Sequence, residues 1–106
     1  MHNMVYLIGR ICDDVKIEKD GDKDIAKITV AVQRSYKDED GVYGTDFIDV
    51  ILYNQIATHT AEYCRKGDLV GLKGVLQNIV VEDHRETFVV ADKISFLASS
   101  KGKEDE

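Results

Sequence analysis

Apolar and polar residues alternate along most of this chain with a period of two, the spacing typical of a half-buried β-strand. The segment 25–34 shows it most clearly, with Ile28, Val30 and Val32 on the core-facing side and polar or small residues between them. Other stretches rich in apolar, β-branched residues cover 4–12, 45–53, 68–81 and 87–98. The pattern therefore predicts five strands.

One segment, 55–66, follows a different period. Ile56, Thr60, Tyr63 and Cys64 recur at three-to-four-residue spacing, which predicts a helix with one face toward the core. We expect Asn54 to cap the start of this helix and Gly67 to end it, because these residue types favour those positions.

Turn signals separate the predicted elements. The polar stretch 35–44 contains two glycines and predicts a long loop, and Asp20-Gly21 predicts a small charged hairpin. Within strands, Gly9 predicts a bulge or sharp bend, and Gly71 and Gly74 mark places where the fourth strand must coil.

The element order is therefore three strands, one short helix and two strands. Sequential antiparallel strands with glycine kinks close into small barrels. The expected fold is all-β, a five-stranded OB-fold barrel with one short helix between strands three and four. We expect residues 1–98 to form this domain and 99–106 to form a short, solvated acidic tail.

Composition limits the classes of function. A chain of 106 residues with 43% hydrophobic residues suits one small folded domain. It has no apolar run long enough for a membrane span and no signal-peptide pattern at its start, so we expect a cytoplasmic location and no membrane partner. The net charge of −6 taken alone argues against nucleic acid, but the acids cluster, which leaves room for a local basic track.

The candidate reactive residues do not form a catalytic or metal-binding pattern. Cys12 and Cys64 are expected to be reduced, buried thiols, and His2, His59 and His84 are scattered. A pairing of His59 with Cys64 is disfavoured because residues five apart share a helix face poorly. We expect no enzyme activity, no metal and no cofactor.

The stretch TDFIDVILYN, residues 45–54, has apolar side chains on both of its faces. Alternation places Ile48 and Val50 toward the core and Phe47, Ile51 and Tyr53 on the opposite face. Pattern alone favours two-sided burial or a subunit contact for the two aromatic residues, Phe47 and Tyr53. A ligand-binding face is the alternative.

Five stretches in order resemble those of one family: NMVYLIGRI, ITVAVQRSY, TDFIDVILYN, AEYCRKGDLV and GVLQ. From Asn3 to about Leu97, the chain is similar to the DNA-binding domain of bacterial-type single-stranded DNA-binding proteins. The resemblance implies non-specific binding of single-stranded DNA, protecting it during replication, recombination and repair. A protein–protein module of a primosome or replication-restart assembly, with weak nucleic-acid binding, is the alternative.

Such binding needs aromatic faces for the bases and cations along the phosphates. The resemblance places Phe47, Tyr53 and Tyr36 at base-stacking positions, with Ile51 and Thr29 completing the surface. For the phosphate contacts we expect Arg10, Arg34, Lys37, Lys66 and Lys73, each of which could equally be a solubilising surface charge.

Other residues receive lower or different expectations. Arg85 lies in a turn that often contacts nucleic acid in OB-folds, whereas His84 and Tyr43 are expected to be ordinary surface residues. Ile79 and Val81 occupy positions that are usually basic and aromatic in the family, which removes one stacking position and some phosphate contacts.

The resemblance also implies an assembly. Met4, Tyr6 and Ile8 share one face of the first strand, which pairs with its copy in the family, so we expect a homotetramer, with a dimer as the alternative. The tail SSKGKEDE has no apolar anchor, so we expect no recruitment of partners that read the family's C-terminal tip.

Overall fold

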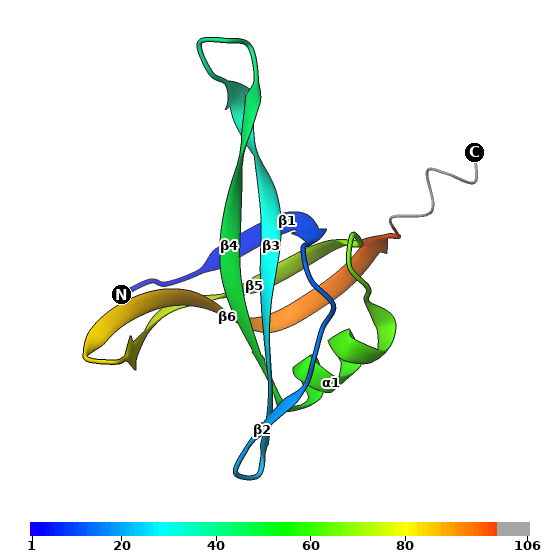
Figure 1. Ribbon diagram of the computed structural model, residues 1–106, viewed down its shortest axis with the longest axis vertical. Helices are drawn as coiled ribbons and strands as arrows, with labels where there is room; N and C mark the ends of the chain where they lie inside the picture. The colour runs from blue at the N-terminus through cyan, green and yellow to red at the C-terminus, as the bar shows by residue number, and fades with distance from the viewer. Residues whose placement is uncertain (100–106) are drawn as a thin grey trace.

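A computed structural model of the 106-residue chain describes residues 1–99 (Figure 1). Within these 99 residues, all regular structure except one helix is β. The elements are β1 (Val5–Ile11), β2 (Glu18–Asp20), β3 (Lys23–Lys37), β4 (Tyr43–Tyr53), α1 (Asn54–Tyr63), β5 (Leu69–Val81) and β6 (His84–Ala98). The five predicted strands and the predicted helix are all present, and β2 forms the expected charged hairpin with β3.

The sheet closes into a barrel because β1 pairs on both of its sides. It runs antiparallel to β5 from Val5 to Arg10 and antiparallel to β3 at Arg10 and Ile11. The strands follow one another around the barrel as β1-β5-β6-β4-β3, and only the β4–β6 pair is parallel. This is the predicted OB-fold, with α1 between the third and fourth barrel strands.

The barrel core is built from small and β-branched side chains. Four barrel strands and α1 contribute the main cluster, which contains Ala26, Ile28, Val30, Val50, Leu52, Ala57, Leu72, Val89 and Ala91. Burying a valine, leucine or isoleucine side chain stabilises a fold by about 1.5–3 kcal/mol. Ile28 and Val30 belong to this cluster, as predicted, while Val32 is only half-buried and packs against it.

Gly9 lies where the backbones of β1 and β3 approach each other. A Cβ atom at this position would clash with the carbonyl oxygen of Ala31 and lie 2.7 Å from Cγ1 of Val30. The pairing of β1 with β5 continues through Gly9 without a shift in register. The predicted bulge is therefore absent, and the glycine instead permits the close approach that closes the barrel.

The two glycines of β5 have different roles. A Cβ atom on Gly74 would clash with the carbonyl oxygen of Val90, at a point where the register of β5 against β6 shifts. A Cβ atom on Gly71 would meet its nearest neighbour, Cδ1 of Leu97, at an ordinary 3.5 Å. Only Gly74 is therefore required where the strand coils.

Strands β3 and β4 continue beyond the barrel as a two-stranded ribbon, which extends upward in Figure 1. The predicted loop at 35–44 is shorter than expected, because β3 runs to Lys37 and β4 starts at Tyr43. The carboxylate of Asp38 closes the remaining turn by accepting hydrogen bonds from the backbone N–H groups of Asp40 and Val42, both at 2.9 Å. The ribbon is therefore an ordered arm.

The second arm is the hairpin of β5 and β6. Its turn is formed by Glu82 and Asp83 alone, whose φ angles of 47° and 68° match a two-residue turn with both central residues left-handed. Because Val81 pairs directly with His84, the turn is shorter than the gap between the predicted strands 68–81 and 87–98. Figure 1 shows this hairpin leaving the barrel in a different direction from the β3–β4 ribbon.

Three details of the predicted helix are wrong. Asn54 has a φ of 56° and makes the turn from β4, while Tyr53 is the capping residue, without a side-chain hydrogen bond. The helix ends at Tyr63, so Gly67 lies beyond it and donates a hydrogen bond to the carbonyl of Ile11. Tyr63 points to solvent, and Ala57 takes the buried place with Thr60.

The C-terminal end of α1 is completed by a cation. Nη1 of Arg65 donates to the carbonyl oxygens of Ala61, Glu62 and Cys64 at 3.0–3.3 Å. A positive charge is favourable there because helix dipoles leave partial negative charge on the last carbonyls.

Among residues 1–99, no helix is long and apolar enough to cross a membrane. The expected tail, apart from Ser99, lies outside the described residues.

The contrast between the two β5 glycines gives a stability prediction. Gly74→Ala should destabilise the fold by about 1–3 kcal/mol, because the new methyl group must displace the β6 backbone. Gly71→Ala, three residues away on the same strand, should be neutral or slightly stabilising, because alanine loses less entropy on folding than glycine. Thermal unfolding measures both, and equal melting temperatures for the two variants would contradict the assignment.

Candidate nucleic-acid interface

Three strands align a cation and an aromatic ring on the outer surface of the barrel. Arg10 of β1 pairs with Ala31 of β3, and Ala31 pairs with Phe47 of β4. Directly opposed residues of antiparallel strands place their side chains on the same face. Arg10 and Phe47 therefore lie on one face, roughly 10 Å apart at their backbones, with only a methyl group between them.

The aromatic residues expected to stack bases differ in exposure. Phe47 is 69% exposed and Tyr36 is 61% exposed, which is unusual for such large apolar groups. Tyr53 shares the face of Phe47 by alternation along β4, but it is half-buried at the end of the strand beside α1. Phe47 therefore offers a freely accessible ring and Tyr53 a partly covered one.

The expectation that Ile51 completes the exposed surface is wrong. Ile51 is 1% exposed because β6 runs alongside β4 and places Val90 next to it. On its other side Ile51 pairs with Lys27, whose Nζ lies 5.9 Å from the ring centroid of the buried Phe88. Thr29 stays on the outer face, where its hydroxyl donates to the carboxylate of Asp49 at 3.1 Å.

A hollow of about 450 Å³ lies between β1 and the base of the β3–β4 ribbon. Arg10 and Ala31 line it, together with Gln33 and Thr45, which pair with each other one step beyond Ala31 and Phe47. The hollow thus extends the surface beside Phe47 with one guanidinium, one amide and one hydroxyl group. Nη1 of Arg10 donates to the carbonyl of Gly67 at 3.0 Å, which fixes the position of its guanidinium.

Arg34 lies on the other face of the ribbon. Its even-numbered position in β3 continues the row of Ile28 and Val30, and Asp46 continues the matching row of β4. The guanidinium donates from Nε and Nη2 to the two carboxylate oxygens of Asp46 at 3.0 and 2.8 Å. The hydrogen bonds from Arg34 hold the pKa of Asp46 below its ordinary value, so both groups stay charged and neutralise each other.

Lys37 lies near the ribbon tip. Lys37 pairs with Tyr43, and its Nζ lies 5.5 Å from the centroid of the Tyr43 ring. Tyr43 follows the alternation of Thr45 and Phe47 along an uninterrupted strand, so it shares their face. Lys37 is therefore the one predicted cation besides Arg10 that the strand register brings to the Phe47 face.

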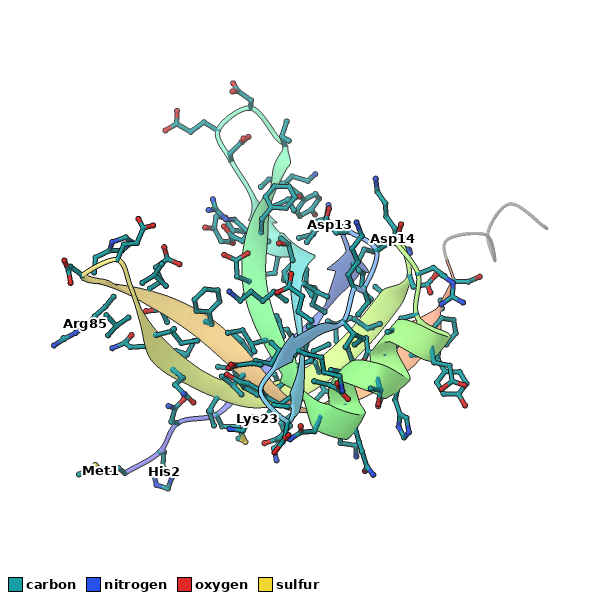
Figure 2. The ribbon with its side chains drawn as sticks, turned by 60° about the horizontal axis from the view of Figure 1, so that its bottom comes forward. Met1, His2, Asp13, Asp14, Lys23 and Arg85 are labelled. Carbon is teal, nitrogen blue, oxygen red and sulfur yellow. The ribbon has the colours of Figure 1, made fainter. Side chains whose placement is uncertain are left out.

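The remaining predicted cations lie elsewhere on the barrel. Lys66 lines a second hollow of about 420 Å³, together with three carboxylates and two further lysines: Asp13, Asp14, Glu18, Lys16 and Lys27. Figure 2 shows Asp13 and Asp14 in the segment that leaves β1.

Lys73 and Arg85 lie on two further surfaces. Lys73 pairs with Tyr6 on the outer face of β1 and β5, and its Nζ lies 3.9 Å from the carboxylate of Asp92. Arg85 points outward from the end of the β5–β6 hairpin (Figure 2). The structure does not bring Lys66, Lys73 or Arg85 together with Phe47.

Two residues on the Phe47 face were not among the predicted site residues, namely Lys27 and Tyr43. Both were recognisable by alternation, because Lys27 precedes Thr29 and Ala31 in the row that faces away from the core, and Tyr43 precedes Thr45 and Phe47. The β5–β6 hairpin contains Ile79 and Val81, and both are half-buried. The family resemblance led us to expect basic and aromatic residues at these positions.

The thiol and imidazole groups have surroundings unlike those of a reactive pair. Cys64 is buried against Ile11 and Val70, and this burial raises the pKa of its thiol, which disfavours the nucleophilic thiolate. His59 is exposed on α1 and packs edge-to-face against Tyr63. Within residues 1–99, no group of three or more His, Cys, Asp or Glu residues could hold a metal ion.

Comparisons with known proteins agree with this geometry. The model of the single-strand binding protein family matches residues 2–97. Single-stranded DNA-binding protein B of Bacillus subtilis is 34% identical over 103 residues, covering 92% of this chain and 91% of the relative. Single-stranded DNA-binding proteins of Streptococcus mutans and Staphylococcus epidermidis are 32% and 31% identical, covering 98% and 100% of this chain and 67% and 83% of the relatives.

A closed OB barrel with an exposed aromatic on its β1–β3–β4 face is an architecture that many nucleic-acid-binding proteins share. The match over nearly the whole chain is more specific. This chain belongs to the single-strand binding protein family.

The Arg34–Asp46 ion pair generates a prediction for pH titration. The carboxyl pKa of Asp46, measured by NMR, should lie below the ordinary aspartate value and return toward it in Arg34→Ala. Because the pKa is lowered in the folded state, the pair adds stability above the ordinary aspartate pKa and loses it as the pH falls through the lowered value. Arg85→Ala, which removes a distant guanidinium, should leave the Asp46 titration unchanged. An unshifted pKa in the parent protein would contradict the pairing.

Proposed function

We propose that this chain binds single-stranded DNA without sequence preference and protects it during replication, recombination and repair. The observation that carries the proposal is the aligned row of Arg10, Ala31 and Phe47 on the outer face of the barrel. Membership of the single-strand binding protein family and relatives named single-stranded DNA-binding proteins support it.

In this proposal a base stacks on the exposed ring of Phe47 and the phosphate next to it meets Arg10. Every base has an aromatic face, so stacking tolerates any sequence, and each stacked base contributes about 1–3 kcal/mol by alanine substitution. The small side chain of Ala31 leaves space between the two groups. The hydroxyl and amide groups of Thr45 and Gln33 lie along the same hollow, where they are able to hydrogen-bond the sugar–phosphate chain.

Aromatic contacts should carry more of the affinity than charge. Arg34 is neutralised by Asp46, so the cations that the strand register brings to the Phe47 face are Arg10, Lys27 and Lys37. The carboxylate of Asp49 on the same face accepts a hydrogen bond from Thr29. Lys37 extends the proposed contact surface along the ribbon, and the half-buried Tyr53 ends it beside α1. Tyr36 is exposed for stacking but interacts with Arg34, which lies on the opposite face of the ribbon.

The alternative function, a protein–protein module of a primosome assembly, has less support than single-stranded DNA binding. The relatives described above are all named single-stranded DNA-binding proteins. A protein–protein module would also have no evident need for an isolated, exposed Phe47 beside an arginine-lined hollow.

We further propose that the chain assembles as a homotetramer in which the outer face of β1 forms the contact within each dimer, and two dimers then pair. Met4, Tyr6 and Ile8 are exposed there in a row, and Leu97 of β6 is exposed as well. Large apolar side chains gathered on one sheet face are typical of subunit contacts. Lys73 pairs with Tyr6 on this face, so the assembly would cover it and remove it from the DNA-contacting set.

A negative charge introduced into this apolar row tests the assembly. Tyr6→Asp should shift the sedimentation profile from tetramer toward smaller species, because a buried, unpaired carboxylate is costly at a subunit contact. The control Tyr63→Asp changes an equally exposed tyrosine on α1 and should keep the parent profile. A parent chain that sediments as a monomer at all concentrations would overturn the proposal.

The proposed function is tested by removing the exposed ring. Phe47→Ala should weaken binding of oligo-dT by about 1–3 kcal/mol, because one stacking surface is lost. The melting temperature should stay close to that of the parent, since Phe47 is largely exposed. Fluorescence anisotropy of labelled oligo-dT and thermal unfolding measure the two effects.

Phe47→Leu keeps an apolar side chain without the aromatic face and should lose most of the same affinity. Tyr63→Ala removes a 67% exposed ring elsewhere and should bind like the parent. Unchanged affinity in Phe47→Ala, or a large loss of stability without loss of binding, would contradict the proposed role.

A further inference from the structure

The tip of the β3–β4 ribbon carries an aromatic ring and a cation in direct register. Tyr43 and Lys37 are the last Cα partners of the two strands before the turn. The register shifts between Gln33 and Lys37, because β3 has two more residues there than the paired segment of β4. Strand β4 itself runs without interruption from Tyr43 to Tyr53. The alternation of β4 therefore places Tyr43, Thr45 and Phe47 on one face.

The exposure along β4 supports this placement. Tyr43, Thr45, Phe47 and Asp49 are exposed, and the residues between them are half-buried. Tyr43 itself is 44% exposed. It lies four residues from Phe47, which corresponds to roughly 13–14 Å along an extended strand.

The ring of Tyr43 is partly accessible to solvent and contacts one cation. Lys37 approaches the ring with its Nζ 5.5 Å from the centroid, a cation–π contact that orients the ring. With the ammonium group on one face of the ring, stacking of a base requires the opposite face. The same ammonium group is able to contact a phosphate, because exposed lysine side chains keep rotational freedom.

The charge of the turn limits how far such a surface extends. Asp38, Glu39 and Asp40 follow directly after Lys37, and Val42 completes the turn before Tyr43. Three consecutive carboxylates repel a phosphate chain. A strand of nucleic acid that follows the Phe47 face would therefore meet its last favourable contacts at Lys37 and Tyr43.

We propose that Tyr43 and Lys37 form a further nucleotide-binding site at the ribbon tip, where a base stacks on Tyr43 and its phosphate meets Lys37. The inference rests on the proposed binding of single-stranded DNA and adds a terminal contact to it. Short oligonucleotides held at Phe47 do not reach this site, whereas longer ones do.

A single tryptophan provides the direct test, because the chain contains none. In Tyr43→Trp, saturating oligo-dT should quench the tryptophan fluorescence, since a stacked base quenches an indole ring. Quenching should appear only above a threshold oligonucleotide length. Tyr63→Trp on α1 is the matched control and should show no quenching at any length.

Affinity measurements separate the tip site from the proposed function itself. Tyr43→Ala should weaken binding of long oligo-dT roughly 5- to 150-fold and leave binding of the shortest bound oligo-dT unchanged. Tyr43→Phe should bind like the parent, because the ring is kept.

The outcomes are distinguishable. If the parent binds oligo-dT but Tyr43→Trp is not quenched and Tyr43→Ala binds normally at every length, the tip site is overturned and the proposed function stands. If Tyr43→Ala weakens short and long oligonucleotides equally, Tyr43 shapes the ribbon and does not bind a base, which also overturns the inference. If the parent does not bind oligo-dT at all, the proposed function fails and the tip site fails with it.

Discussion

The close approach of β1 to β3 at Gly9 is the constraint on which the rest of the structure depends. Because no Cβ atom stands between Gly9 and the carbonyl of Ala31, β1 is able to pair with β3 on one side and β5 on the other. That double pairing closes the barrel, and it also sets Arg10 opposite Ala31 and hence in line with Phe47. A side chain at position 9 would separate the strands, so closure of the fold and assembly of the proposed binding face have the same physical cause.

The acidic balance of the chain is compatible with a nucleic-acid interface because most of the acids are kept away from its centre. One group lies in the segment after β1 and the β2–β3 hairpin, and another forms the turn at the ribbon tip. Of the two carboxylates nearest Phe47 in β4, Asp46 is on the opposite face against Arg34, and Asp49 accepts a hydrogen bond from Thr29. A net charge of −6 therefore says little about the potential beside Arg10 and Phe47.

Local pattern predicted the elements well, and its failures come from contacts between distant segments. Alternation placed Ile51 on the second face of its strand correctly, but the parallel passage of β6, which buries Ile51, depends on barrel closure and has no local signal. The same limit explains Gly9, whose role depends on a strand about twenty residues away. Arg34 is different, because its even-numbered position already set it in the row of Ile28 and Val30, opposite the face of Phe47. Tyr53 could be given a face from sequence but not an exposure, since α1 follows it directly and covers part of it.

Backbone amide NMR of the full chain titrated with oligo-dT would locate the contact surface of single-stranded DNA. For DNA bound across the β1–β3–β4 face of the barrel, the largest shift changes fall on Arg10, Ala31 and Phe47 and on their neighbours along the ribbon, while α1 around Tyr63 stays unchanged. Shift changes centred on Tyr6 and Lys73 of the β1–β5 face, with the amide of Phe47 unaffected, would contradict this placement.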